Sequence, residues 1–173
     1  MGYHHVAITT TDLPTTHRFY TEACGFSLQK VEAAPTPEGG WARHVFYDTG
    51  NGDMFAIWDI HSDQVGRDHS TAISTGLGWP EWANHIAFAA ADLDDIRAKR
   101  ERWYDHGCDV LEIDHGWCTS VYTRDPNGVL VEFCTSTRTF TDADREEAAR
   151  LLAAEQPELD LEPPSVQFFL HEQ

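Results

Sequence analysis

The sequence lacks the features that mark membrane proteins and secreted, disulfide-bonded proteins. No apolar run approaches the roughly 20 residues that a membrane span needs. The four cysteines lie far apart with no C-x-x-C pair, and the first residues show no basic segment followed by an apolar one, as a secretory signal would. We therefore expect reduced cysteines and a cytoplasmic protein.

Positive charge is also scarce. The 173 residues include 12 Lys and Arg against 29 Asp and Glu, which gives a formal net charge of −17. Such a surface repels phosphate backbones and anionic lipid headgroups, so neither nucleic acid nor a membrane is an expected partner. A small-molecule substrate is the remaining expectation, and the chain is long enough for one folded domain with a sizeable core.

The chain contains an internal repeat with an offset of 80 residues. Residues 5–13 read HVAITTTDL, and residues 85–93 read HIAFAAADL. In each copy a short apolar strand opens with His, and an Asp suited to cap a helix follows seven residues later. The repeat therefore predicts helices over roughly 13–24 and 93–106.

Each predicted helix is followed by three strand-like segments. They lie near 26–34, 42–49 and 53–60 in the first copy, and near 108–114, 118–125 and 129–135 in the second. Asn51-Gly52 and Asn127-Gly128 are hairpin turn signals at matching places. The pattern predicts an α+β fold of two βαβββ modules, at about 3–60 and 83–136, joined by a linker at about 61–82.

The two modules would form a single domain over residues 1–138, and residues 139–173 would add a C-terminal helix and tail. The helix is expected over 141–156, with Thr141 as its N-cap. The tail, from Pro157, is acidic and then apolar. We expect this apolar end to dock on the core of the chain or on a partner subunit.

Three side chains stand out as candidate metal ligands. His5 and His85 open equivalent strands and share a strand face with small residues, so each can line a cavity. Glu132 is the sole acid in an otherwise apolar strand, where a carboxylate is costly unless it is paired or bound to a metal. Two imidazoles and one carboxylate are typical of non-haem Fe(II), with Mn(II) or another divalent cation as alternatives.

Either His5 or His85, taken alone, is most simply interpreted as a hydrogen-bonded core residue.

Aligning the two Asn-Gly turns places Ala56 at the position equivalent to Glu132, so the first module offers no fourth ligand there. Asp125, in the segment DPNG, is best interpreted as part of a tight turn.

The two repeat segments, together with YTRDPNGVLVEF at 122–133, resemble the vicinal oxygen chelate superfamily. That group includes glyoxalase I, bleomycin-resistance proteins, fosfomycin-resistance thiol transferases, methylmalonyl-CoA epimerase and type I extradiol ring-cleaving dioxygenases. The resemblance covers roughly residues 3–136. It implies that the two modules curl into an eight-stranded sheet around a metal cleft, and that the chain pairs as a homodimer.

Within this group the sequence is most similar to the type I extradiol dioxygenases. These use a His-His-Glu set, a tyrosine ten residues before the Glu, and an acid–base histidine in the segment before the second His ligand. Tyr122 and His69 stand at those positions, with His69 in the stretch HSTAIST. The resemblance implies an Fe(II) enzyme that cleaves a catechol-like vicinal diol with dioxygen, in which His69 moves a proton and Tyr122 hydrogen-bonds a bound oxygen.

Several alternatives stay open. His61 and His115 are alternatives to His69 as the acid–base group. A metal-dependent glyoxalase-like isomerase or lyase, acting on a small oxygenated substrate without dioxygen, would use the same three ligands. A non-catalytic ligand-binding protein would keep the fold without turnover. The absence of a fourth ligand at Ala56 disfavours glyoxalase I and the epimerase themselves, which look like four-ligand sites.

Overall fold

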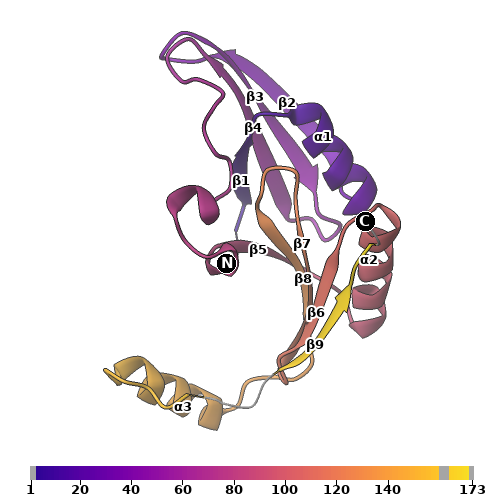
Figure 1. Ribbon diagram of the computed structural model, residues 1–173, viewed down its shortest axis with the longest axis vertical. Coiled ribbons are helices and arrows are strands. Elements are labelled where there is room, and N and C mark those ends of the chain that lie inside the picture. The colour runs from indigo at the N-terminus through magenta and orange to yellow at the C-terminus, as the bar shows by residue number, and fades with distance from the viewer. Residues whose placement is uncertain (1–2, 160–163, 172–173) are drawn as a thin grey trace.

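The computed structural model describes residues 3–159 and 164–171 and arranges their strands in two β-sheets (Figure 1). The first sheet has the order β1-β4-β3-β2, and the second has the order β5-β8-β7-β6-β9. β1 is parallel to β4 and β5 is parallel to β8, whereas all other pairs are antiparallel. The strands are β1 (His5–Thr10), β2 (Ser27–Pro35), β3 (Gly40–Asp48), β4 (Met54–Ser62), β5 (His85–Ala89), β6 (Val110–Asp114), β7 (Cys118–Arg124), β8 (Leu130–Ser136) and β9 (Ser165–Phe169).

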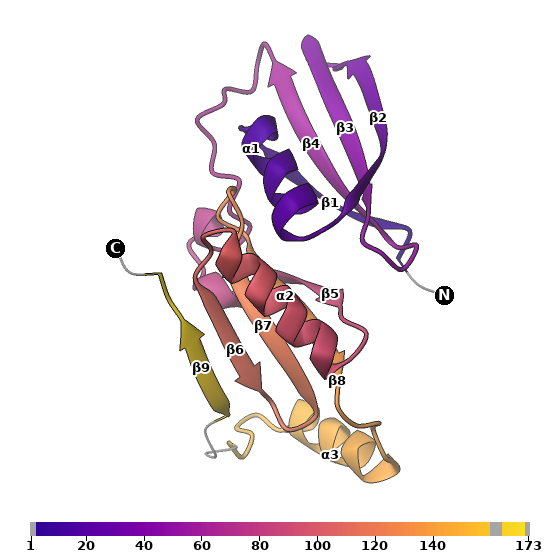
Figure 2. The same cartoon turned by 90° about the vertical axis from the view of Figure 1, so that its right-hand side faces the viewer.

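The predicted helices of the two modules lie on the outer, convex side of the sheets (Figure 2). They are α1 (Leu13–Arg18), which continues into the π-helical turn η1 (Phe19–Ala23), and α2 (Leu93–Asp105). The predicted N-caps are confirmed. Asp12 accepts a hydrogen bond from the amide of Thr15, and Asp92 accepts from the amides of Asp94 and Asp95 in the first turn of α2.

The register of the sheets confirms the alignment of the two repeats. In the first module Ala7 of β1 is paired with Ala56 of β4. In the second module Ala87 of β5 is paired with Glu132 of β8. Ala56 and Glu132 are therefore equivalent positions, each on the strand that flanks the first strand of its module.

One hydrophobic core joins the two modules. The ring of Phe26, from the first module, lies 4.9 Å from the ring of Phe88 in the second. The fully buried Tyr20 in η1 donates a 2.8 Å hydrogen bond to Asp125, in the turn between β7 and β8. Burial, and then the charge of Asp125, raise the pKa of Tyr20 well above its usual value. Asp125 also accepts from the amides of its own turn, which confirms its structural role.

The sheet arrangement differs from the expected single eight-stranded sheet. The described residues form one four-stranded and one five-stranded sheet, and no backbone pairing joins their edge strands β1 and β5. The fifth strand of the second sheet is β9, from the apolar end of the tail, which pairs antiparallel with β6. Apolar side chains alternate along this segment, which allows it to extend the sheet. The pairing of β9 with β6 could not be predicted, because the two segments lie far apart in the sequence. Residues 160–163 of the tail lie outside the described residues.

The connecting segments also contain short elements. The linker between the modules forms two 3-10 turns, η2 (Thr75–Leu77) and η3 (Glu81–Ala83). After β8, α3 (Asp142–Ala153) begins at the capping box of Thr141 and Asp144, as predicted, and projects away from the sheets (Figure 1). None of the helices in the described part of the chain is long and apolar enough to cross a membrane.

Candidate metal centre

The second sheet brings together two of the three predicted metal ligands. Nε2 of His85 lies 3.1 Å from Oε2 of Glu132. His85 opens β5, and Glu132 is in register with Ala87 two residues further along the same strand, so both side chains are on one face of the sheet. Glu132 is 5% exposed, whereas the side chain of His85 is 38% exposed. The pair therefore has a buried carboxylate on one side and an accessible imidazole on the other.

The hydrogen bonding of His85 suits a metal ligand. Its Nδ1 lies 3.1 Å from the backbone carbonyl oxygen of Trp82, in η3. A carbonyl oxygen can only accept, so Nδ1 donates to it, and Nε2 is the ring nitrogen that faces the carboxylate. A proton or a cation between Nε2 and the carboxylate oxygen would hold the two groups together. Donation to a backbone carbonyl through the other ring nitrogen is also how metal-binding histidines are oriented.

Tyr122 lies beside this pair, as its spacing predicts. It is the direct cross-strand partner of Glu132, and its ring centre is 6.2 Å from that of His85. Burial, with a smaller contribution from the charge of Glu132, raises the pKa of Tyr122 to about 12. Its hydroxyl group is 3.1 Å from Nε2 of His115, in the turn between β6 and β7. Sequence reasoning named His115 only as an alternative, because its approach to Tyr122 depends on the hairpin register.

His5 lies elsewhere, on the first sheet. Its Nδ1 is 2.8 Å from Nδ1 of His4, and its ring packs near those of His44 and Phe46, at 5.7 and 5.4 Å. Across residues 3–159 and 164–171, no three His, Cys, Asp or Glu side chains gather closely enough to hold a metal. A single chain therefore assembles His85 with Glu132 and leaves His5 separate from them.

The other predicted histidines have different surroundings. His69 is exposed in the linker, and no hydrogen bond or aromatic contact to the His85–Glu132 pair is found among the described residues. His61 belongs to a separate polar cluster, in which it hydrogen-bonds the buried Asp59 at 3.0 Å and stacks on Trp41. Of the three candidate acid–base histidines, His115 is the one joined to Tyr122.

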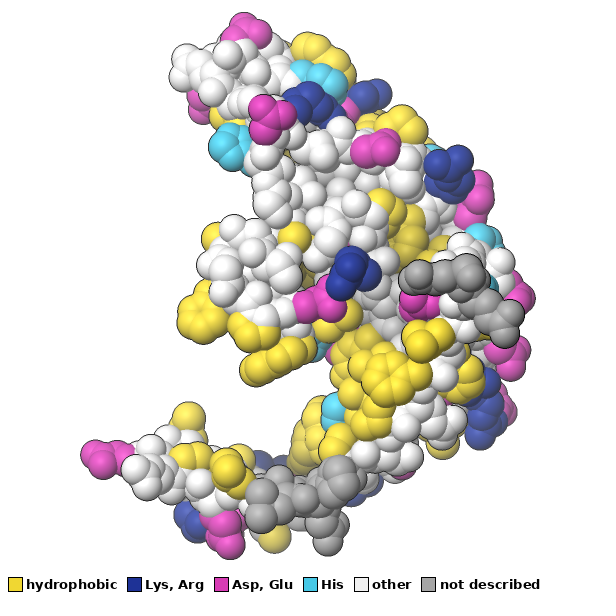
Figure 3. All heavy atoms as spheres, in the orientation of Figure 1, with side chains coloured by type: hydrophobic (Ala, Val, Ile, Leu, Met, Phe, Trp, Pro, Cys, Tyr) yellow, Lys and Arg dark blue, Asp and Glu magenta, His cyan; other side chains and the backbone are white. Residues whose placement is uncertain are grey.

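A groove of about 490 Å³ lies on the second sheet, beside Tyr122. It shares Tyr122 and Leu130 with the surroundings of the pair, since Leu130 is the register partner of His85. Its far side is formed by Phe168 and Leu170, from β9 and the residue that follows it. Figure 3 shows hydrophobic side chains around the hollow between the middle of the molecule and α3. The groove falls within the range of volumes typical of small-molecule sites.

Comparison with known proteins agrees with this architecture. The sequence profile of the Glyoxalase/Bleomycin resistance protein/Dioxygenase superfamily matches residues 2–133. No curated protein matches the chain significantly in sequence. The match leaves out α3 and β9, so the wall of the groove that β9 supplies lies outside the shared region.

Several solved structures share the fold. A glyoxylase/bleomycin resistance protein/dioxygenase domain from Frankia sp. EAN1pec is similar with a TM-score of 0.61 and 18% identity, over 79% of this chain and 98% of that one. The fosfomycin resistance protein FosX from Listeria monocytogenes gives 0.56 and 17%, over 79% and 94%. Lactoylglutathione lyase from Agrobacterium tumefaciens gives 0.51 and 21%, over 77% and 92%. At such identities the likeness concerns the fold.

Proposed function

The chain belongs to the Glyoxalase/Bleomycin resistance protein/Dioxygenase superfamily, and from that premise we propose that it is a divalent-metal enzyme acting on a small substrate with two neighbouring oxygens. Members of this superfamily are often enzymes, including lyases, transferases and dioxygenases, and they commonly use divalent metals. The single observation that carries the proposal is the approach of His85 to Glu132 at 3.1 Å.

The donor set fits a cation. Metal–ligand bonds to imidazole nitrogen and carboxylate oxygen are about 2.0–2.2 Å long, so two such donors in adjacent coordination positions stand about 3 Å apart. The observed separation matches this value, and the fixed Nδ1–H of His85 leaves Nε2 free to bind. Imidazole and carboxylate together favour Fe(II), with Mn(II) as an alternative.

His5 would complete the set from a second copy of the chain. It lies on a strand face with Ala7 and Thr9, all three exposed in a single chain, and the face of His85 and Ala87 is likewise exposed. Two exposed faces of small side chains, each with an imidazole at the equivalent position, are complementary halves of one site. A homodimer would therefore form two such sites, because each copy supplies one His5 and one His85–Glu132 pair.

The reaction proposed is oxidative cleavage of a catechol-like diol. When bound, Fe(II) would supply coordination positions for both diol oxygens and for dioxygen. Tyr122, the cross-strand partner of Glu132, would donate its hydroxyl proton to an oxygen held beside Glu132. His115, with Nε2 3.1 Å from that hydroxyl, can accept a proton through Tyr122 and return it. This assigns to His115 the acid–base role that the sequence resemblance implied for His69.

A metal-dependent isomerase or lyase is the second candidate. Its support is the similarity in fold to lactoylglutathione lyase, and it would use the same ligands without dioxygen. The two candidates differ in what they consume: the dioxygenase takes up one dioxygen for each diol cleaved, and the isomerase or lyase takes up none.

The test combines metal binding with oxygen uptake. The chain would be purified without air and titrated with Fe(II), and oxygen consumption would be followed with a panel of catechols. We expect Glu132→Gln to weaken Fe(II) binding by at least about a hundredfold and to abolish uptake, since ligand loss exceeds the effect of losing an outer hydrogen bond. Glu146→Gln, an exposed carboxylate on α3, is the matched control and should change neither.

Each outcome separates the candidates. Uptake coupled to a yellow ring-cleavage product supports the dioxygenase. Tight binding without uptake on any catechol supports the isomerase or lyase, and a metal-swap screen with small carbonyl substrates would follow. Unchanged Fe(II) affinity in Glu132→Gln would remove the metal site from the proposal.

A further inference from the structure

One continuous row of side chains crosses four of the five strands of the second sheet. Glu132 is the cross-strand partner of Tyr122, Tyr122 of Leu111, and Leu111 of Phe168. Direct partners share a face, so all four side chains point to the concave side. With neighbouring strands about 4.8 Å apart, the row runs for about 14 Å from the candidate metal ligand to Phe168.

The last member of the row is strongly exposed. Phe168 is 65% exposed, and Leu170, which also lines the groove, is 60% exposed. An exposed aromatic side chain in a groove, in register with a candidate catalytic tyrosine, is poised to contact a ligand. Both residues belong to the C-terminal segment that the superfamily profile does not reach.

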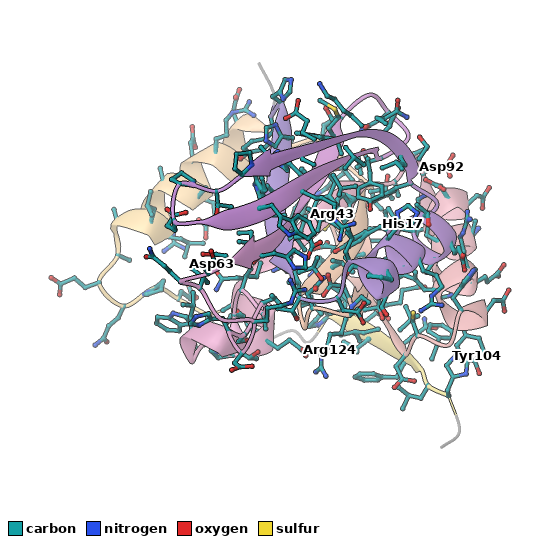
Figure 4. All side chains as sticks on the ribbon, turned by 90° about the horizontal axis from the view of Figure 1, so that it is seen from above. His17, Arg43, Asp63, Asp92, Tyr104 and Arg124 are labelled. Carbon is teal, nitrogen blue, oxygen red and sulfur yellow. The ribbon has the colours of Figure 1, made fainter. Side chains whose placement is uncertain are left out.

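The opposite face of β9 fixes this orientation. Phe169 packs under the guanidinium group of Arg100, 4.5 Å from the ring centre, and pairs with the buried Val110. Beyond the strand, the amide of His171 donates to Asp109 at 2.8 Å, and its ring stacks on Tyr104, which lies beside the end of β9 (Figure 4). A slip of one residue would turn Phe168 away from the groove, and these anchors oppose such a slip.

We propose that β9 is a specificity wall, with Phe168 as the residue that selects elongated, uncharged aromatic diols over single-ring ones. The diol would bind at the His85–Glu132 end, and a second ring would lie over Leu111 and against Phe168. The orientation of the diol rests on the proposed function, whereas the apolar part of the groove exists without a metal.

Size and charge identify this ligand class. A cavity of about 150 Å³ holds one benzene ring, so a groove of about 490 Å³ leaves most of its volume unfilled by a single-ring ligand. At the rim, Arg124 is ion-paired with Glu81, so the groove offers a ligand a balanced pair of charges instead of an isolated cation. The chain as a whole carries −17, which disfavours an anion.

The binding test uses metal-free protein, with 4-phenylphenol and phenol as the two probes, titrated by calorimetry. Wild-type protein should prefer 4-phenylphenol. Phe168→Ala should weaken 4-phenylphenol binding about tenfold, the usual worth of one aromatic pair, and leave phenol binding unchanged. Val166→Ala is the matched control, because Val166 is exposed on the same face of β9 but does not line the groove. Thermal unfolding would show that both variants fold.

The inference and the proposed function can fail separately. Wild-type protein that does not bind Fe(II) but still prefers 4-phenylphenol through Phe168 would support the specificity wall. The same result would contradict the proposal of a metal enzyme. Equal affinity of wild type and Phe168→Ala for 4-phenylphenol, or no preference over phenol in the wild type, would overturn the wall.

Discussion

At the scale of single residues, His115 and His69 are the two candidates for the acid–base group of the site. The 3.1 Å approach of His115 to the Tyr122 hydroxyl gives it a path to a substrate proton, and His69 has no such hydrogen bond among the described residues. We expect His115→Ala to lower kcat by about 10²–10⁴-fold with little change in Fe(II) affinity. His69→Ala, measured alongside, should stay within a few-fold of wild type.

The reverse result would restore the role that the sequence resemblance gives to His69. A large loss of kcat in His69→Ala, with near-normal turnover in His115→Ala, would mean that the linker reaches the site in the working enzyme. Equal and large losses would mean that the two histidines act in different steps.

Asp59 carries a second prediction at this scale. Its carboxylate is 1% exposed and accepts hydrogen bonds from Arg43, at 3.0 and 2.6 Å, and from His61, at 3.0 Å. Burial works to raise the pKa of Asp59, but the bonds from His61 and Arg43 outweigh it, so the net pKa is lowered. A lowered pKa in the folded state means that the carboxylate stabilises the fold at neutral pH and loses this effect as acid protonates it.

Asp59→Asn should therefore lower the free energy of unfolding by about 1–3 kcal/mol at pH 7, measured in urea. The gap between wild type and variant should stay constant above about pH 5 and narrow below about pH 4, as wild-type Asp59 protonates. Asp68→Asn removes the same formal charge from an exposed position and should show no such gap. A gap that is independent of pH down to pH 3 would contradict the ionic role of Asp59.

The residues that sequence reasoning found or missed differ in a physical way. The caps at Asp12 and Asp92 and the turn at Asp125 depend on neighbours within a few positions, so local patterns reveal them. The proximity of His85 and Glu132 follows from repeat and strand alternation. The hydrogen bond from His85 to Trp82 could not be predicted, because its acceptor is a backbone carbonyl oxygen, which every residue carries.

At the scale of elements, the start of β3 depends on a glycine. Gly40 has φ of +91°, and a Cβ placed on it would lie 2.0 Å from the carbonyl oxygen of His61 on β4. Because that oxygen belongs to the backbone, it cannot move aside without disturbing the β3–β4 pairing. We expect Gly40→Ala to lower the free energy of unfolding by about 1–3 kcal/mol.

Gly66 is the natural control for this change. It lies in the linker with open space around it and no positive φ, so Gly66→Ala should be close to neutral. Urea unfolding of both variants measures the difference. If Gly40→Ala and Gly66→Ala have the same free energy of unfolding, the backbone of β3 and β4 can move apart at Gly40 without loss of stability.

The elements most easily predicted were those with a repeated or periodic pattern. Both βαβββ modules and the capped helix at Thr141 match their predicted ranges within a few residues. The sequence predicts only an apolar tail at residues 165–169. Their pairing with β6 joins segments about 50 residues apart in the chain, and no local pattern predicts such a contact. The π-helical turn after α1 likewise has no local signature.

At the scale of the whole molecule, the separation of His5 from His85 and Glu132 leads to a test of assembly. If a second copy supplies His5, then His5→Ala and Glu132→Ala each destroy every site in their own homodimers. A mixed dimer keeps one intact site, formed by the unaltered His5 of one copy and the unaltered Glu132 of the other. Mixing the two inactive variants in equal amounts should therefore restore about a quarter of wild-type Fe(II) sites.

The control is a mixture of His5→Ala with the double variant His5→Ala/Glu132→Ala, which can form no intact site and should recover nothing. Light scattering would establish that the chains are dimeric under the same conditions. No recovery in the first mixture, with dimers present and exchanging subunits, would contradict a site shared between two copies. Recovery would show that the site is shared.

The equivalence of Ala56 and Glu132 shows where a second acidic side chain could be introduced. The two positions occupy the same register in the two halves, but one carries a methyl group and the other a carboxylate. A single replacement, Ala56→Glu, would put a second acid at the position of the first module that is equivalent to Glu132. Because Ala56 is fully buried, the new charge would be tolerated only with a cation to neutralise it. The first module would thus accept a carboxylate at this position only together with a bound cation.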